Sequence, residues 1–230
     1  MIAVGTHALL TDDVAFNRLG LVICDEQHRF GVEQRAKLSE KGEHPHLCVM
    51  SATPIPRTLG LIIYGDLDIS VIDEYPRGRQ KVDCYCVDSS YRARIYSYIK
   101  KFLNAGQQGY IVCPLVEENE NAAYIGAEEY YKEIREGEFS GYRVGILHGK
   151  MSASRKEAAM RAFTSGETQL LVCTTVIEVG VDVPNAAVML IENAERFGLS
   201  QLHQLRGRIG RGSLASSCIL ISDITSGPTA

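Results

Sequence analysis

Short apolar runs alternate with amphipathic stretches along the chain. The first two runs are residues 19–24 (LGLVIC) and 47–50 (LCVM), and later runs occupy residues 110–113, 144–147, 170–173, 188–191 and 218–221. None shows the strict alternation of apolar and polar positions that marks a strand with one face in water. Continuous apolar runs of this length are typical of strands covered on both faces, as in a parallel sheet.

The stretches between these runs predict helices. Residues 154–166 show the pattern best, because Ser154 and Glu157 have the spacing of a capping box and Gly166 marks an end. Between them, Ala159 and Phe163 are expected on one apolar face. Strands and helices in alternation indicate an α/β architecture with right-handed crossovers.

A boundary between two domains is predicted at residues 74–80 (EYPRGRQ), where proline and glycine stand among charges. About five strands can be assigned after this segment, which is enough for a near-complete α/β domain. Only two clear strands and a weaker third precede it. We therefore expect a partial domain at residues 1–76, a near-complete domain at residues 77–226 and a frayed end at residues 227–230.

The composition of the chain excludes only a few classes of protein. The chain has 230 residues, 45% of them hydrophobic and 23% charged, which is ordinary for a soluble globular protein. No apolar run approaches the roughly 18 residues of a membrane span, and nothing at the start resembles a signal peptide. The net charge of −4 neither indicates nor excludes nucleic-acid binding, because phosphate contacts need only a local basic patch. We expect a cytoplasmic protein.

The chain has seven cysteines and no C-x-x-C pair. Five of them stand in the apolar runs, which predicts buried, reduced thiols. These five are Cys24, Cys48, Cys113, Cys173 and Cys218. His44 and His46, together with Cys48, have the chemistry of metal ligands, but Pro45 between the histidines favours a surface turn.

Polar residues follow the first two apolar runs. Asp25 and Glu26 come directly after residues 19–24, and Ser51 and Thr53 follow the next run. In open α/β sheets, ligands bind outside the carboxyl ends of the strands. Two adjacent acids there suit phosphoryl transfer, in which one holds Mg²⁺ through water and the other orients or deprotonates the attacking water. A solvated acidic turn is the alternative interpretation.

A second group of polar residues lies in the predicted second domain. Thr174 and Thr175 follow residues 170–173, and Gly180 and Asp182 come shortly after. Gly180 permits close approach of a backbone, and we expect Asp182 near an edge of the sheet where a ligand can sit. An ordinary glycine turn is the alternative interpretation.

The sharpest signal is residues 204–211 (QLRGRIGR), which hold three arginines spaced by glycines. If this segment is helical, Arg208 and Arg211 share one face. A permanently charged guanidinium is what the transition state at a γ-phosphate needs from a neighbouring domain, and such an arginine finger accelerates hydrolysis by roughly 10³–10⁵. A solvated basic helix end and an RNA-binding arginine patch are the competing interpretations.

No G-x-x-x-x-G-K-[ST] sequence occurs in the chain. Residues 145–151 (GILHGKM) approach it, but the glycine spacing is one short and Met151 replaces the hydroxyl that binds Mg²⁺. Without this P-loop, the β- and γ-phosphates of ATP lose their main cradle and lysine. We therefore expect the isolated chain not to hydrolyse ATP.

In order, these segments resemble the motor of superfamily-two helicases. Gly5-Thr6-His7 is similar to motif Ib, residues 25–28 to motif II of the DExH type, residues 51–53 to motif III, residues 174–182 to motif V and residues 204–211 to motif VI. Several motifs in the correct order are far more specific than any one of them.

The resemblance narrows to the RecG family of bacterial branch-migration helicases. It is strongest at residues 25–32 (DEQHRFGV), 51–59 (SATPIPRTL), 174–186 (TTVIEVGVDVPNA) and 197–212 (FGLSQLHQLRGRIGRG). The nearest rival is the family of transcription-repair coupling translocases, which shares the RFGV and PIPRTL stretches. That family more often carries glutamate at the position of Gln27, and it differs around Val179.

The resemblance implies RecA-like parallel sheets flanked by helices, with ATP and Mg²⁺ as cofactors and branched DNA (forks and Holliday junctions) as the partner of a monomeric motor. Asp25 would hold Mg²⁺ through water, Glu26 would be the catalytic base, and Arg208 and Arg211 would reach the γ-phosphate. The residues implied in ATP binding or coupling are Gln27, His28, Ser51, Thr53, Gly180, Asp182 and Gln204. Those implied in DNA binding are Gly5, Thr6, His7, Thr174 and Thr175.

Two other classes of protein stay open. The chain can be a nucleic-acid-binding or interaction module without catalysis, which an upstream P-loop in the whole protein would exclude. It can also be an unrelated doubly wound enzyme that acts on a small phosphorylated ligand. That class predicts that Asp25 and Arg211 act independently, whereas a motor predicts that they face one cleft.

Overall fold

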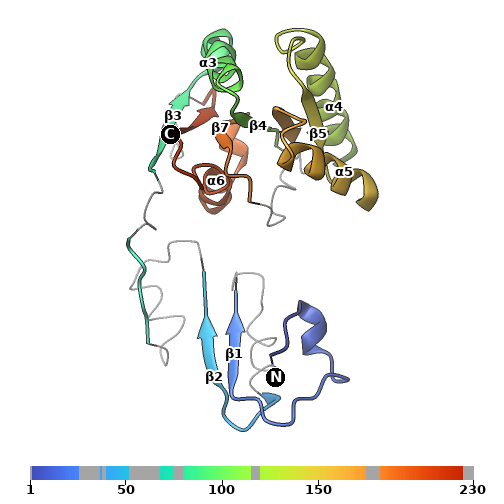
Figure 1. Ribbon diagram of the computed structural model, residues 1–230, viewed down its shortest axis with the longest axis vertical. Helices are drawn as coiled ribbons and strands as arrows, with labels where there is room; N and C mark the ends of the chain where they lie inside the picture. The colour runs from blue at the N-terminus through green and yellow to red at the C-terminus, as the bar shows by residue number, and fades with distance from the viewer. Residues whose placement is uncertain are drawn as a thin grey trace. The chain divides into compact units, whose positions relative to one another are not determined.

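The computed structural model describes residues 2–25, 37, 40–51, 68–74, 80–114, 120–174 and 182–224, with the side chains of one helix described only from residue 126. The chain divides into two compact units, Met1–Ser70 and Val71–Ala230 (Figure 1).

The first unit contains a short parallel pair of strands, β1 (Leu21–Cys24) and β2 (His46–Val49), after a 3₁₀ helix, η1 (His7–Leu10). Val22 and Cys24 are buried on one face of β1, whereas Leu21 and Ile23 on the other face are 55% and 59% exposed. The prediction that both faces of this run are covered is therefore wrong for β1. The hydrophobic cluster of the described residues lies on one face only, so the alternate side chains remain in solvent.

The second unit is built around a six-stranded parallel sheet in the order β3-β8-β7-β4-β6-β5. Its strands are β3 (Val82–Val87), β4 (Gln108–Val112), β5 (Val144–Leu147), β6 (Leu170–Cys173), β7 (Ala186–Ile191) and β8 (Ser216–Ile221). Its helices are α3 (Arg92–Asn104), α4 (Glu120–Glu136), α5 (Ala153–Thr164) and α6 (Leu199–Arg206), with short 3₁₀ segments η3 (Ser89–Tyr91) and η5 (Ala194–Arg196).

Helices cover both faces of this sheet. Along β4, Tyr110 and Val112 pack in one cluster with residues of α5 and α6, and Ile111 packs in a second cluster with residues of α3 and α4. Because successive side chains of a strand point to opposite faces, one apolar run contributes to both cores. Every residue of β4, β6 and β7 is buried. The predicted α/β architecture, with helices flanking a parallel sheet, is confirmed.

The helix predicted at residues 154–166 begins earlier than its proposed capping box. Ser152 is the N-cap of α5, and its side chain accepts a hydrogen bond from the backbone nitrogen of Arg155 (3.4 Å). The predicted box of Ser154 and Glu157 is therefore wrong, because Ser154 already lies inside the helix. The predicted end and apolar face are confirmed, since Gly166 has a φ of 80° after the last turn and Phe163 is fully buried.

All seven cysteines are reduced, and most of the predicted burial is confirmed. Cys24, Cys113, Cys173 and Cys218 are buried. Cys48 is exposed, so its predicted burial is wrong, because it lies on the face of β2 that alternates with the inward residues Leu47 and Val49.

Candidate functional site

The arginine-rich segment forms a turn after α6. The helix ends at Arg206, and the backbone nitrogen of Gly207 closes it by donating to the carbonyl of His203 (3.1 Å). Gly210 has a φ of 68°, and a Cβ at this position would lie 2.6 Å from Val82 Cγ2. Arg208 and Arg211 therefore do not share a helical face, because α6 ends before both of them and Gly210, with its positive φ, lies between them.

Arg211 is held by two acceptors. Its Nε donates to the carbonyl oxygen of Gly207 (3.0 Å), and its Nη1 lies 3.7 Å from Oδ1 of Asp182. The side chain of Arg211 is 32% exposed and that of Asp182 is 55% exposed. Two segments singled out separately in the sequence therefore meet here. Asp182 precedes β7 and Arg211 precedes β8, so the pair lies towards the amino ends of these strands.

Tyr110 belongs to the hydrophobic cluster that also contains Val183 and Ile209, near the two members of this pair in the sequence, and it was not predicted as a site residue. Its side chain is 1% exposed, and burial raises its pKa well above the usual value. Cys173 also raises this pKa, while the positive charges of Arg208 and Arg211 lower it and the charge of Asp182 raises it. The charges of both guanidinium groups and of the carboxylate therefore act on the same phenol. The sequence marks Tyr110 only as one member of an apolar run.

Gln204 lies on α6, one turn before Arg208, and both are half-buried. Of the predicted residues of this unit, the structure brings Asp182 and Arg211 together as an ion pair. Gln204 and Arg208 lie in the same segment as Arg211, on α6 and in the turn that follows it.

Thr174 lies at the other end of its strand, directly after β6. It is fully buried, and its backbone nitrogen donates to the carbonyl of Leu147 (3.2 Å). Its hydroxyl has no hydrogen-bond partner among the residues that the structure describes. The predicted contact between Thr174 and DNA does not fit this conformation, because a fully buried hydroxyl cannot touch a nucleic-acid strand.

Asp25 and Ser51 follow neighbouring parallel strands of the first unit. Cys24 pairs in register with Val49, and the backbone nitrogen of Met50 donates to the carbonyl of Cys24 (2.8 Å). Asp25 and Ser51 therefore end adjacent strands at the same edge, and both are exposed. The predicted site residues Glu26, Gln27, His28, Thr53, Thr175 and Gly180 lie outside the described residues.

The predicted DNA-contacting segment at the amino end is exposed. Thr6 is the N-cap of η1 and makes no side-chain cap hydrogen bond, while its carbonyl accepts from the backbone nitrogen of Leu9 (3.0 Å). Gly5 packs closely on Leu9, since a Cβ at Gly5 would lie 2.9 Å from Leu9 Cγ. Gly5, Thr6 and His7 are accessible to a ligand in this unit.

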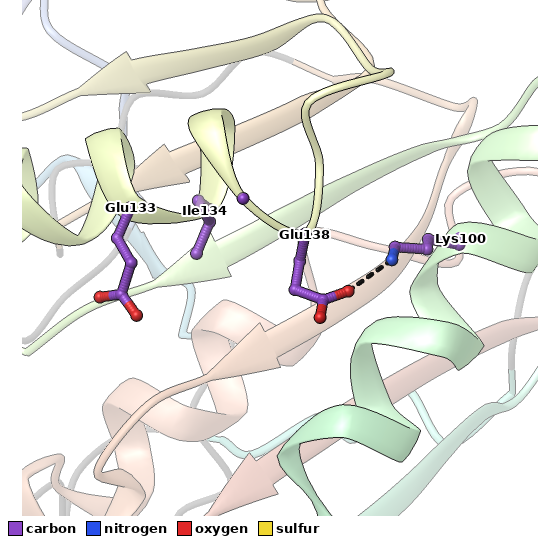
Figure 2. A pocket seen from close by; sticks show the side chains of 5 residues that line it. Lys100, Glu133, Ile134 and Glu138 are labelled. Atoms are coloured by element: carbon purple, nitrogen blue, oxygen red, sulfur yellow. Dashed lines mark hydrogen bonds and ion pairs between the residues drawn. The ribbon is translucent and has the colours of Figure 1, made fainter.

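A hollow of about 390 Å³ lies elsewhere, between α3 and the end of α4. Lys100 and Glu138 form an ion pair of 2.6 Å at its rim (Figure 2). It contains none of the predicted site residues. Across the described parts of the chain, no three His, Cys, Asp or Glu side chains gather as metal ligands, and no helix is long and apolar enough to cross a membrane.

Comparison with known proteins places this site in a family. The helicase conserved C-terminal domain matches residues 94–213, which include Asp182, Arg208 and Arg211. The chain therefore belongs to this family. Dbp5 of S. cerevisiae, solved with RNA and ADP-BeF3, shares the fold with a TM-score of 0.64, although only 14% of residues are identical.

Closer relatives are RecG helicases, which confirms the resemblance seen in the motifs. The ATP-dependent DNA helicase RecG of Synechocystis is 54% identical over 96% of this chain, and that of Bacillus subtilis is 51% identical over 96%. A structure of RecG bound to a three-way DNA junction matches 95% of the chain with 46% identity and a TM-score of 0.72. The chain spans 26% and 33% of the two RecG sequences and 28% of the solved chain.

Proposed function

We propose that this chain forms part of the motor of an ATP-dependent DNA helicase that drives branch migration at forks and Holliday junctions. The observation that carries the proposal is the ion pair between Arg211 and Asp182, in a turn that also bears Arg208 and whose backbone is set by Gly210. The names of the RecG relatives support ATP as the fuel and DNA as the substrate. In the whole protein, the motor would act as a monomer in the bacterial cytoplasm.

In this proposal, Arg211 is the arginine finger and Arg208 supports it. A guanidinium keeps its charge at every physiological pH and offers several donors in a fixed plane, which suits the charge that develops on a γ-phosphate. The nitrogen Nε of Arg211 donates to the carbonyl of Gly207, and the side chain is 32% exposed, so its Nη atoms stay available to a ligand. Gln204 would help to position the nucleotide and the attacking water.

Asp25 would hold Mg²⁺ through water. Its exposed carboxylate stands at the carboxyl end of β1, beside Ser51 at the end of β2. Hard oxygen donors of this kind fit Mg²⁺, which keeps several waters and takes only one or two carboxylates in nucleotide sites. The ion would neutralise charge on the β- and γ-phosphates, and Glu26 would act as the base for the attacking water.

The DNA contacts would come from Gly5, Thr6 and His7 in the first unit and from Thr175 in the second. For Thr174, the burial of the hydroxyl supports a role through its neighbours and not through direct contact. Binding and hydrolysis of ATP would then be coupled to DNA contact through segments that carry both ATP-binding and DNA-binding residues.

The test is DNA-stimulated ATPase activity of the whole helicase that carries this segment, on forked DNA. Arg211→Ala should lower kcat by roughly 10³-fold or more while DNA binding stays unchanged. Arg161→Ala, which removes a largely exposed arginine from α5, is the matched control. A nearly silent Arg211→Ala variant would reject the arginine-finger role. A whole protein that binds forks but never hydrolyses ATP would favour a binding module.

A further inference from the structure

The ion pair between Asp182 and Arg211 is loose. Its separation of 3.7 Å exceeds the roughly 2.7–2.9 Å of a charge-assisted hydrogen bond, and both side chains are partly in solvent. A pair of this kind contributes little to stability. Holding the fold together is therefore not its main effect.

The backbones on both sides of the pair are firmly placed. Next to Asp182, Val183 is 2% exposed, and near Arg211, Ile209 is fully buried. Gly212 lies against the other segment, since a Cβ at this position would be 3.1 Å from the carbonyl oxygen of Pro184. The buried neighbours and this close approach therefore hold the two segments together at Val183, Pro184, Ile209 and Gly212, while the side chains of Asp182 and Arg211 stay partly in solvent.

The carboxylate and a phosphate compete for the same cation. Asp182 partly neutralises the guanidinium of Arg211, and its own negative charge repels an approaching polyphosphate. A phosphate that binds Arg211 must displace or outweigh this carboxylate. Because the pair is loose and partly exposed, the exchange requires only a rotation of side chains.

We propose that Asp182 is a positioning residue that holds Arg211 in a resting position until a nucleotide phosphate replaces the carboxylate. This inference rests on the proposed role of Arg211 as an arginine finger. Asp182 acts through Arg211 and does not touch the reacting atoms. It sets how readily the finger leaves its resting place, and so it sets the apparent affinity for ATP.

The experiment is a double-mutant cycle in the whole helicase, with steady-state ATPase on forked DNA and binding of a non-hydrolysable ATP analogue. Asp182→Asn keeps the shape of the side chain and removes its charge. We expect it to lower the KM for ATP and the Kd of the analogue by about two- to five-fold, the range that corresponds to a surface ion pair. In the Arg211→Ala background, the same substitution should leave the Kd unchanged.

Glu157→Gln is the matched control, because Glu157 forms an exposed ion pair of 2.8 Å with Arg161 on α5, and it should change neither KM nor Kd. The proposal is overturned if Asp182→Asn raises the KM for ATP or the Kd of the analogue, or if its effect on the Kd persists without Arg211. A silent Arg211→Ala variant is a different outcome, because it rejects the arginine finger itself. A merely structural role for Asp182 would change the melting temperature and leave the Kd per folded molecule the same.

Discussion

Arg92 and Glu192 form an ion pair that joins the first residue of α3 to the end of β7. Glu192 is 5% exposed, and its Oε1 also accepts a hydrogen bond from the hydroxyl of Tyr130 on α4 (2.7 Å). The hydroxyls of Tyr96 and Tyr130 lie 2.7 Å apart. Burial lowers the pKa of Arg92, but hydrogen bonds to Glu192 and Tyr96 and the charge of Glu192 outweigh it and raise this pKa. One buried carboxylate therefore links two helices to the sheet.

Removing the guanidinium of Arg92 should destabilise the second unit more than removing the guanidinium of an exposed arginine. Arg92→Ala leaves Glu192 buried without its charged partner, and breaking a fully buried pair costs roughly 3–5 kcal/mol. Because the side chain of Arg92 is 36% exposed and solvent screens it, we expect a loss of about 2–3 kcal/mol in the free energy of unfolding. Urea denaturation measures it.

Arg161→Ala is the control for this measurement. It removes an arginine that is 74% exposed from an ion pair within α5, and we expect a change of less than about 0.5 kcal/mol. Equal losses for the two variants would show that the Arg92 network does not stabilise the fold.

Gly210→Ala should damage the arginine-bearing turn. A residue with a side chain resists a φ of 68°, and the added Cβ would meet Val82 Cγ2 at 2.6 Å. We expect a loss of about 2–4 kcal/mol in the free energy of unfolding from strain and overpacking together, and a fall in the ATPase activity of the whole helicase as Arg211 shifts.

Gly166→Ala is the control that separates strain from overpacking, because Gly166 has a φ of 80° but open space around it. It should lose only about 1–2 kcal/mol and keep its activity. Equal effects at both positions would exclude a role for the contact with Val82.

Thiol reactivity should follow burial. At pH 8, a thiol reagent should modify Cys48, Cys84 and Cys86 in the folded chain and spare the four buried cysteines. Burial, with a smaller effect of the charge of Glu192, raises the pKa of Cys113 to about 12. Burial, with a smaller effect of Cys84, raises the pKa of Cys218 to about 12. Modification of seven thiols without denaturant would contradict the structure.

The same pKa shifts predict the direction of a pH effect on stability. The unfolded thiols ionise near their usual pKa of 9.0, whereas the folded ones stay protonated up to about 12. Between these values the folded state binds more protons, so the free energy of unfolding should fall as pH rises, by up to about 1.4 kcal/mol per pH unit for each thiol. Urea denaturation at about pH 8.5 and about pH 10.5, on either side of the pKa of the unfolded thiols, measures this fall in the free energy of unfolding. The Cys113→Ala variant should show a smaller fall.

The sequence was sufficient for five strands of the large sheet but not for the edge strand β3. Continuous apolar runs predicted β4, β6, β7 and β8, which lie between two neighbours, and also β5, which forms the other edge. Strand β3 was missed, since residues 82–87 (VDCYCV) mix polar and apolar side chains, and Tyr85 is 50% exposed. The apolar signature is weak in β3 because solvent covers part of this strand.

Local patterns also could not predict contacts between distant residues. The arginines of the turn were found as a group, but the helix pattern did not show that Gly207 ends α6 before Arg208. Arg92 and Glu192 stand 100 positions apart, and neither is part of a recognisable motif. Their pairing depends on the order of strands in the sheet, which is a property of the whole fold.

Thr174 offers a test that separates stability from function. Its buried hydroxyl has no partner among the described residues, and an unsatisfied buried hydroxyl costs about 1–3 kcal/mol. Thr174→Val replaces it with a methyl group of similar shape, so we expect the free energy of unfolding to stay equal or to rise by about 1 kcal/mol. If the hydroxyl finds its partner only when nucleotide or DNA binds, the same variant should lower DNA-stimulated ATPase activity of the whole helicase. Thr174→Ser, which keeps the hydroxyl, should retain that activity. A Val variant that is destabilised by more than about 1 kcal/mol would show that the hydroxyl is already hydrogen-bonded in the resting protein.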